Sequence, residues 1–141
     1  MNTPILRCVP SRTTIIIRIM VGVVFLSEGL QKLIIPEVRG AERFRALGLP
    51  APEFLGHLVG CTEMVCGLLI LSGFLTRLAA IPLMIIMLTA FAATKADIYV
   101  NEGFWGFMHQ SRTDWAMFWG CIFLFIKGGG RWSLDNKIAG V

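Results

Sequence analysis

The sequence predicts an all-α integral membrane protein whose helices form one antiparallel four-helix bundle. Of its 141 residues, 55% are hydrophobic and only 16% are charged, whereas about 25% of a typical soluble domain is charged. The mean hydropathy is +0.70, and a chain of 15.6 kDa has too small an interior to hide that much apolar surface from water. These observations argue against a soluble globular protein and against disorder. The length suits a single domain over residues 1–141.

Four apolar runs supply the predicted helices. The first, residues 15–35, would span about 31 Å as a helix, close to the hydrocarbon thickness of a bilayer. Only Thr76 and Arg77 separate the second run from the third, which predicts a tight antiparallel turn between neighbouring helices. The fourth run is short, so we extend its helix backwards, and three consecutive glycines from Gly128 end it. Membrane helices are therefore expected near residues 13–35, 54–75, 78–97 and 112–127.

Four crossings place both chain ends on one side of the membrane. The terminal side carries seven flanking basic residues (Arg7, Arg12, Arg18, Arg77, Lys127, Arg131, Lys137), and the other side carries six (Lys32, Arg39, Arg43, Arg45, Lys95, Arg112). This difference favours cytoplasmic termini, in a multi-pass protein of a bacterial-type inner membrane. Longer loops at residues 36–53 and 95–113 would then face outward. The second loop holds Phe104, Trp105, Phe107 and Met108, which suit either an interfacial aromatic belt or a lid over a site.

Polar residues inside the apolar runs are expected to face protein, because a charge in hydrocarbon is costly. Small residues let membrane helices approach closely, so helix packing is predicted at Gly22, Gly29, Gly60 and Gly67. Glu63 shares the face of Gly60 and Gly67 and should point into a helix–helix interface. Two states are open to it. It is either ionised and paired, with Lys32 as the best partner, or protonated, as a group that exchanges a proton or donates a hydrogen bond.

Several ionisable residues should converge in the outer half of the bundle. Glu28 and Lys32 are spaced four apart on one helix, an arrangement that favours an ion pair. Two interpretations remain: a network of ion pairs that holds the helices together, or a polar pocket that handles a proton or a polar headgroup. The candidate pocket residues are Glu28, Lys32, His57, Glu63, Asp97, Arg112 and Asp114, with Lys95 beside them.

A series of motifs in this order resembles the DoxX family. The motifs are Arg18-Ile19-x-x-Gly22, Phe25-Leu26-x-x-Gly29-x-x-Lys32, Gly48-Leu49-Pro50, Glu63-x-x-x-Gly67, Gly73-Phe74-Leu75-Thr76-Arg77-Leu78-Ala79-Ala80, Arg112-Thr113-Asp114 and Gly128-x-Gly130-x-Trp132-Ser133-Leu134-Asp135. The resemblance extends over residues 14–136 and implies a four-helix membrane protein. The family takes its name from a subunit of a thiosulfate:quinone oxidoreductase, but most members have no established activity. The resemblance therefore informs the fold more than the function.

The first functional hypothesis is a membrane subunit or accessory protein of a quinone-linked oxidoreductase system. An apolar slot would hold the quinone ring, Lys32, His57 or Arg112 would donate hydrogen bonds, and Glu28 or Glu63 would relay protons. Electrons would come from a soluble or membrane redox partner, because the chain carries no GxGxxG signature and no recognisable cysteine spacing for an iron–sulfur cluster. The cofactor is unknown; quinone is the candidate, whereas haem and metal are not expected. The residues leave open whether the chain is itself an enzyme.

Two alternatives belong to other classes. The protein could be a small-molecule carrier or channel, which would need a homo-oligomer because four helices are few for a pathway. It could also be a non-catalytic assembly module of the membrane. The basic residues, with a net charge of +4, flank apolar runs, so lipid headgroups and not nucleic acid are the expected partners. The four cysteines, Cys8, Cys61, Cys66 and Cys121, are expected to be inert thiols.

Overall fold

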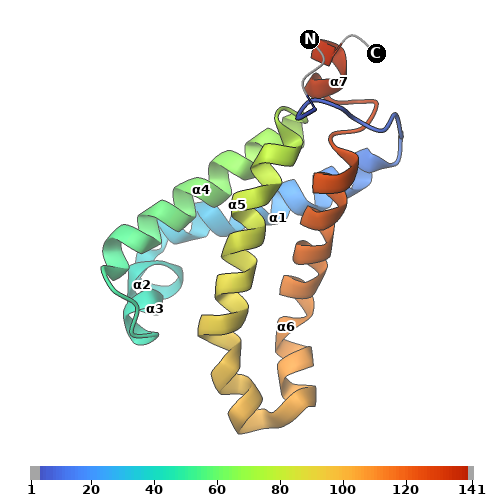
Figure 1. The fold of residues 1–141 in the computed structure, drawn as a ribbon. Coiled ribbons are helices and arrows are strands. Elements are labelled where there is room, and N and C mark those ends of the chain that lie inside the picture. Colours follow the sequence, from blue (N-terminus) through green and yellow to red (C-terminus); the bar gives the residue numbers. More distant parts are fainter. Residues whose placement is uncertain (1–3, 140–141) are drawn as a thin grey trace.

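The computed structural model describes residues 4–139, which contain helices and no strand. Figure 1 shows two long helical hairpins joined at one end of the molecule. The first pairs α1 (Thr14–Ile34) with α4 (Pro52–Ser72), and the second pairs α5 (Thr76–Ala90) with α6 (Ala96–Lys127). The predicted all-α membrane fold is therefore confirmed. The remaining elements are the short helices α2 (Pro36–Arg39), α3 (Ala41–Ala46) and α7 (Leu134–Ala139), and the π-helix η1 (Phe91–Lys95).

Among the described residues, three helical segments are long and apolar enough to cross a membrane. The helices α1 and α4 have 21 residues each, and the third segment, Thr76–Lys127, has 52. As one straight helix that segment would be about 78 Å long, more than twice the thickness of a bilayer core. It is divided at Gly103, whose φ of 74° and ψ of −171° are not helical. The chain therefore reverses direction at Gly103, at the lower end of the second hairpin in Figure 1.

The prediction of a loop at residues 95–113 was wrong. In its place the chain is helical on both sides of Gly103, and the reversal needs that single residue. The polar side chains of Asn101, Glu102 and Gln110 lie on exposed helical turns near this reversal. Glycine adopts a positive φ without steric conflict from a Cβ atom. The chain can therefore reverse at this one residue, without a loop.

The turn between α4 and α5 also lies slightly earlier than predicted. The helix α4 ends at Ser72, and Gly73 follows with a φ of 72°. The Phe74 N–H donates to Leu69 O at 3.0 Å, a closing bond typical of helices that end in a left-handed glycine. Thr76 and Arg77, expected to form the turn, are in the first turn of α5 instead. The two crossings are neighbours, as the short connection predicted.

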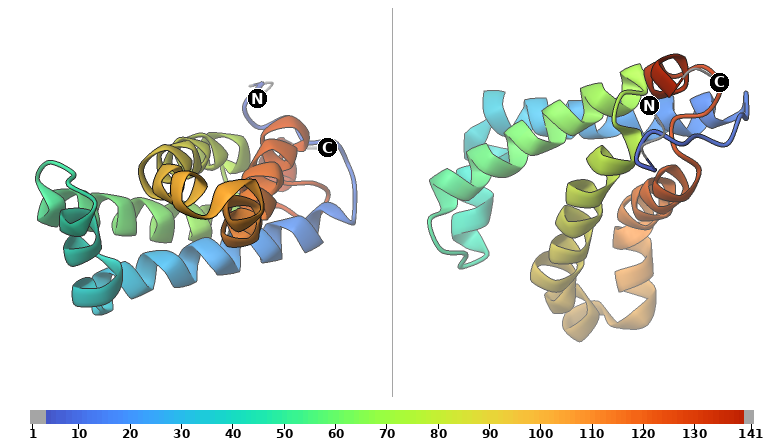
Figure 2. Two further views of the ribbon diagram at one scale, coloured as in Figure 1. Left: turned by 90° about the horizontal axis from the view of Figure 1, so that it is seen from below. Right: turned by 45° about the horizontal axis from the view of Figure 1, so that its top comes forward.

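Glycines bring α1 and α4 into close contact. A Cβ atom added to Gly29 would lie 2.6 Å from Gly60 O, and one added to Gly67 would lie 3.0 Å from Gly22 O. Only hydrogen fits at such distances, so the two backbones touch along most of their length. The structure thus places all four glycines that the sequence singled out at this one contact. Two views in Figure 2 show α1 and α4 side by side.

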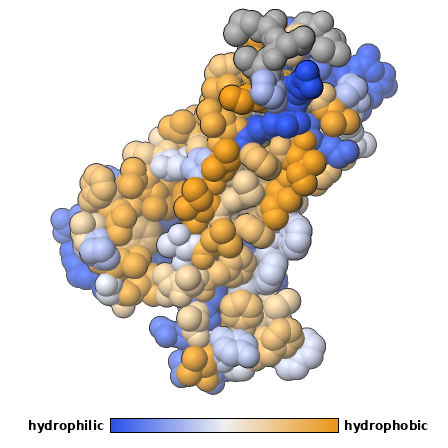
Figure 3. Space-filling model, viewed as in Figure 1, coloured by the Kyte–Doolittle hydropathy of each residue, from blue (hydrophilic) through white to orange (hydrophobic). Residues whose placement is uncertain are grey.

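The apolar core lies where the two hairpins join. Val21 and Phe25 of α1 meet Ile70 of α4, Leu83 of α5 and Leu124 of α6, each at most 1% exposed. Away from this junction the hairpins diverge (Figures 1 and 2). Hydrophobic side chains cover the long helices, while hydrophilic ones gather near the chain ends, around α2 and α3, and at the hairpin tip (Figure 3). That distribution suits a protein whose middle is covered by lipid.

Candidate functional site: a charged cleft between the two hairpins

The divergence of the hairpins leaves a cleft of about 560 Å³, a volume within the usual range of small-molecule sites. Its walls are mostly apolar and come from α1, α3, α4, α5 and α6. Charged residues from both hairpins reach it: Glu28, Lys32, Arg39, Arg43, Glu63, Lys95 and Asp114. An apolar cavity with a few convergent polar groups is the usual form of a ligand site.

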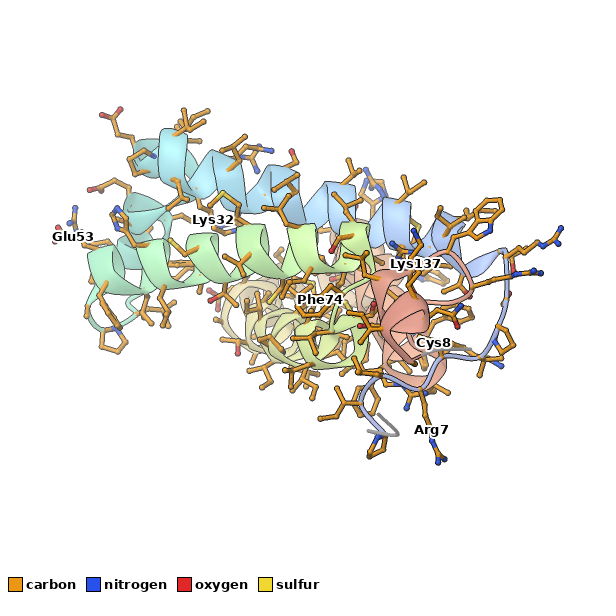
Figure 4. All side chains as sticks on the ribbon, turned by 90° about the horizontal axis from the view of Figure 1, so that it is seen from above. Arg7, Cys8, Lys32, Glu53, Phe74 and Lys137 are labelled. Carbon is orange, nitrogen blue, oxygen red and sulfur yellow. The ribbon has the colours of Figure 1, made fainter. Side chains whose placement is uncertain are left out.

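On the first wall, Lys32 joins two carboxylates. Its Nζ lies 2.7 Å from Glu63 Oε2 and 3.6 Å from Glu28 Oε2. The Glu63 side chain is 2% exposed and the Lys32 side chain 12%. The glycine contact sets this geometry, because the α1 and α4 backbones are close enough to place Lys32 opposite Glu63. Lys32 lies between the two helices in Figure 4. Lys32, the partner that the sequence predicted for Glu63, is therefore the side chain next to it.

On the opposite wall, Lys95 joins Asp114. Its Nζ lies 3.4 Å from Asp114 Oδ2 and donates to Gln110 O at 3.0 Å. The Lys95 side chain is 11% exposed and that of Asp114 is 26% exposed. Lys95 thus bridges the α5 and α6 arms of the second hairpin, just above its tip. Two ammonium groups, each held by a carboxylate, therefore face one cleft from different hairpins.

The π-helix η1 positions Lys95. Its five residues, Phe91–Lys95, interrupt the regular turn between α5 and α6, and such π-turns often mark functional sites. Lys95 is the buried residue of this turn, whereas Asp97, two positions later, is exposed. Phe91, at the other end of the turn, packs on Trp115 of the returning arm, with ring centroids 5.3 Å apart.

Three residues of the predicted pocket are not brought to the cleft. His57 is exposed, and its ring contacts the carbonyl of Glu53 within α4. Arg112 is exposed and donates to the His109 carbonyl at 2.9 Å. Asp97 and Arg112 are both exposed, and neither lines the cleft. The cleft therefore contains four of the seven predicted residues: Glu28, Lys32, Glu63 and Asp114.

The sequence analysis missed other residues of the cleft, namely Arg39, Arg43, Gln110 and Thr113. The two arginines belong to a segment expected to be a plain loop, which instead folds as α2 and α3 over one side of the cleft. The spacing of four residues between Arg39 and Arg43 was the sequence feature that could have indicated that they lie near each other. The aromatic residues near the tip divide: Phe107 packs on Phe91 and Tyr99, whereas Trp105 is 81% exposed, which is typical of a side chain at the membrane interface.

A second cluster of buried polar groups, away from the cleft, joins the chain ends to the hairpins. Arg18 is 3% exposed and donates to Ile70 O, Leu71 O, Gly129 O and Trp132 O at 2.9, 2.6, 3.3 and 2.5 Å. Asp135 of α7 accepts from the backbone N–H groups of Leu75 and Thr76 at 2.7 and 3.0 Å, and so caps α5. The Arg18 guanidinium group and both Asp135 carboxylate oxygens are bonded to main-chain groups of the fold, so we assign these two residues a structural role.

Residues 4–139 contain no group of three or more His, Cys, Asp or Glu side chains arranged to hold a metal ion. The four cysteines are free thiols. Cys66 and Cys121 are buried in the core, where they act as small apolar side chains. The charged side chains that line the cleft are those of lysines, arginines and carboxylates.

The fold and the cleft define a multi-pass membrane protein with paired charges between two helical hairpins. Residues 13–96 match the DoxX family. The chain is also similar to the uncharacterized membrane protein Rv3486 of Mycobacterium tuberculosis, with 47% identity over 133 residues, which cover 90% of this chain and 82% of the relative. No solved structure matches it. The chain belongs to the DoxX family.

Proposed function

We propose that this protein binds a quinone in the cleft and serves a quinone-linked oxidoreductase system as a membrane subunit or accessory protein. One observation carries the proposal: Lys32 and Lys95 reach the same apolar cleft from different hairpins. A quinone is a flat apolar ring with two carbonyl oxygens that accept hydrogen bonds. The cleft offers apolar walls for such a ring and a charged donor on either side, and it lies among membrane-spanning helices, where quinones dissolve.

The ion pairs also suit the proton requirement of quinone chemistry. Reduction of a quinone to a quinol takes up two electrons and two protons, one proton at each oxygen. The Lys32 and Lys95 ammonium groups would orient the two oxygens, and the carboxylates paired with them would exchange protons with water at the rim. The electrons would come from a redox partner protein at the membrane. The same residues, run in the opposite direction, serve oxidation of a quinol.

Photoaffinity labelling tests the site directly. The purified protein would be illuminated with an azido derivative of a decyl-tailed benzoquinone, digested, and analysed by mass spectrometry. We expect label on peptides from the cleft walls, within residues 85–95 and 110–117, and competition by the unmodified quinone. Label spread evenly over all lipid-facing helices, or unaffected by the competitor, would refute a defined quinone site.

Lys95→Met should weaken quinone binding by roughly 10- to 100-fold, because a hydrogen bond from a charged donor contributes about 1.5–3 kcal/mol. The measurement is a binding titration of the decyl-tailed benzoquinone with detergent-solubilised protein. Lys137→Met is the matched control, since Lys137 is exposed on α7, which lies opposite the tip of the α5–α6 hairpin (Figure 1). If both variants bind as the unchanged protein does, Lys95 has no part in the site.

We also infer that the protein lies in a bacterial-type inner membrane with cytoplasmic chain ends, from the excess of basic residues on that side. Single cysteines at Arg45 in α3 and Lys137 in α7, both exposed, would be introduced into a cysteine-free variant. An impermeant thiol reagent added outside cells should label the Arg45 position only. Labelling of Lys137 alone would reverse the orientation, and labelling of both would contradict the four crossings.

A further inference from the structure

Two arginines line the cleft without an acidic partner among residues 4–139. Arg39 ends α2 and Arg43 lies in α3, and both are exposed and line the cleft. The carboxylates of the cleft are all paired with its lysines. In the neighbouring part of the connection, Arg45 is paired with Glu42 and Glu53. Within residues 4–139 the structure gives Arg39 and Arg43 no ion pair, so the rim carries two uncompensated positive charges.

Exposed apolar side chains surround the same segment. Ile34 at the end of α1 is 68% exposed, Val38 in α2 is 64% exposed, and Phe54 at the start of α4 is 66% exposed. Exposing a group of large apolar side chains like these to water is unfavourable in free energy. A short segment that presents apolar side chains next to arginines, at the end of a pair of membrane helices, is typical of the boundary between acyl chains and headgroups. Figure 1 shows α2 and α3 at the end of the first hairpin, far from the chain ends.

We propose that Arg39 and Arg43 bind the phosphate of one anionic phospholipid, whose acyl chains cover Ile34, Val38 and Phe54. The planar guanidinium group matches a phosphate through paired N–H donors, and Arg39 and Arg43 line the same cleft from the adjoining helices α2 and α3. Charge complementarity argues for an anionic lipid and against a zwitterionic one, whose own cationic group would meet two uncompensated positive charges. Glu37, although close in sequence, does not line the cleft. This site lies at the rim and is separate from the lysines proposed to hold a quinone.

Native mass spectrometry tests this lipid site. The protein would be incubated in detergent with equal amounts of dioleoylphosphatidylglycerol and dioleoylphosphatidylcholine, and the ratio of the two singly bound forms measured. We expect the unchanged protein to retain the anionic lipid preferentially. In Arg39→Gln/Arg43→Gln that preference should fall about 30-fold, which corresponds to about 1 kcal/mol for each basic side chain near an anionic headgroup. The conservative variant Arg39→Lys/Arg43→Lys should keep most of it.

The matched control is Arg12→Gln/Arg131→Gln, which removes the same charge from two exposed arginines near the chain ends. An equal loss in both double variants would show diffuse attraction to a basic protein and overturn the proposal. Displacement of the lipid by millimolar inorganic phosphate would also overturn it, because the rim would then bind a free anion. If the double glutamine variant does not fold, Arg39→Gln and Arg43→Gln alone should each lower the preference about fivefold, and no loss in either would count against the site.

Quinone binding, measured on the same samples, keeps the two proposals distinguishable. Arg39→Gln/Arg43→Gln should lose the lipid preference and still bind the decyl-tailed benzoquinone. Lys95→Met should lose the quinone and keep the lipid. Loss of both ligands in the arginine variant would mean that the rim belongs to a single larger site, which would refute a separate lipid site.

Discussion

Replacing Arg18 with methionine should destabilise the protein by about 4 kcal/mol or more. Arg18 is nearly fully buried, and its guanidinium group serves four backbone carbonyls, two at the end of α4 and two in the segment after α6. Hydrogen bonds from a charged donor contribute about 1.5–3 kcal/mol each, and unsatisfied buried acceptors add their own cost. Methionine fills similar space without a donor, so the chain ends should detach from the helices. Thermal unfolding in detergent, followed by circular dichroism, would measure the loss.

Two comparisons make this prediction specific. Arg12→Met removes the same charge from an exposed position six residues earlier and should change the melting temperature little. Arg18→Lys should fall between the two, because one ammonium group cannot reach carbonyls arranged around a planar fork. A melting temperature for Arg18→Met equal to that of Arg12→Met would mean that the four carbonyls are satisfied in another way.

The sequence around Arg18 does not indicate that its side chain binds four main-chain carbonyls. Helical spacing placed Arg18 on the same face as Gly22 and Lys32, which predicted an inward-facing charge. Its partners, however, are main-chain carbonyls 52 to 114 residues away in the chain. Every residue has a main-chain carbonyl, so a sequence pattern cannot show which carbonyls a buried arginine will bind. The same holds for Asp135, which caps α5 through two backbone N–H groups from about 60 residues away.

The fold was more accessible to prediction than the site. Apolar runs of membrane-spanning length predicted the crossings, because hydrophobic thickness and helical rise leave little freedom. The positions of Gly22, Gly29, Gly60 and Gly67 predicted the α1–α4 contact, since only small residues permit it. The reversal at Gly103 was missed, because one glycine in a polar stretch looks the same whether the chain forms a loop or a kinked helix.

For the cleft, depth in the membrane could be estimated, but direction around the helix axis could not. Asp97 and Arg112 are exposed and do not line the cleft, whereas Lys95, at the end of η1, is buried and lines it. Glu63 and Lys32 were predictable as a pair because the glycines around them already specified the facing sides of α1 and α4. Arg39 and Arg43 required the unforeseen fold of α2 and α3.

The second large effect is expected at Glu63. Glu63→Gln leaves Lys32 as a largely buried ammonium group without its closest counterion, and breaking a buried pair in this way typically costs about 3–5 kcal/mol. The lower end of that range is expected here, because Glu28 lies 3.6 Å from the Lys32 Nζ and can compensate in part. Glu53→Gln is the matched control: it is the same change on the same helix, at an exposed pair with Arg45, and should cost less than about 1 kcal/mol.

A double variant separates the structural role of the Glu63–Lys32 pair from its role in the cleft. Lys32→Met/Glu63→Met removes both charges at once, and apolar side chains of similar volume often restore the stability that a broken buried pair loses. We therefore expect the melting temperature to return close to that of the unchanged protein, while binding of the decyl-tailed benzoquinone is weakened, because Lys32, one of its two proposed charged donors, is gone. A double variant that is stable and still binds the quinone would show that the pair only holds α1 to α4. A Glu63→Gln variant no less stable than Glu53→Gln would contradict the buried pairing itself.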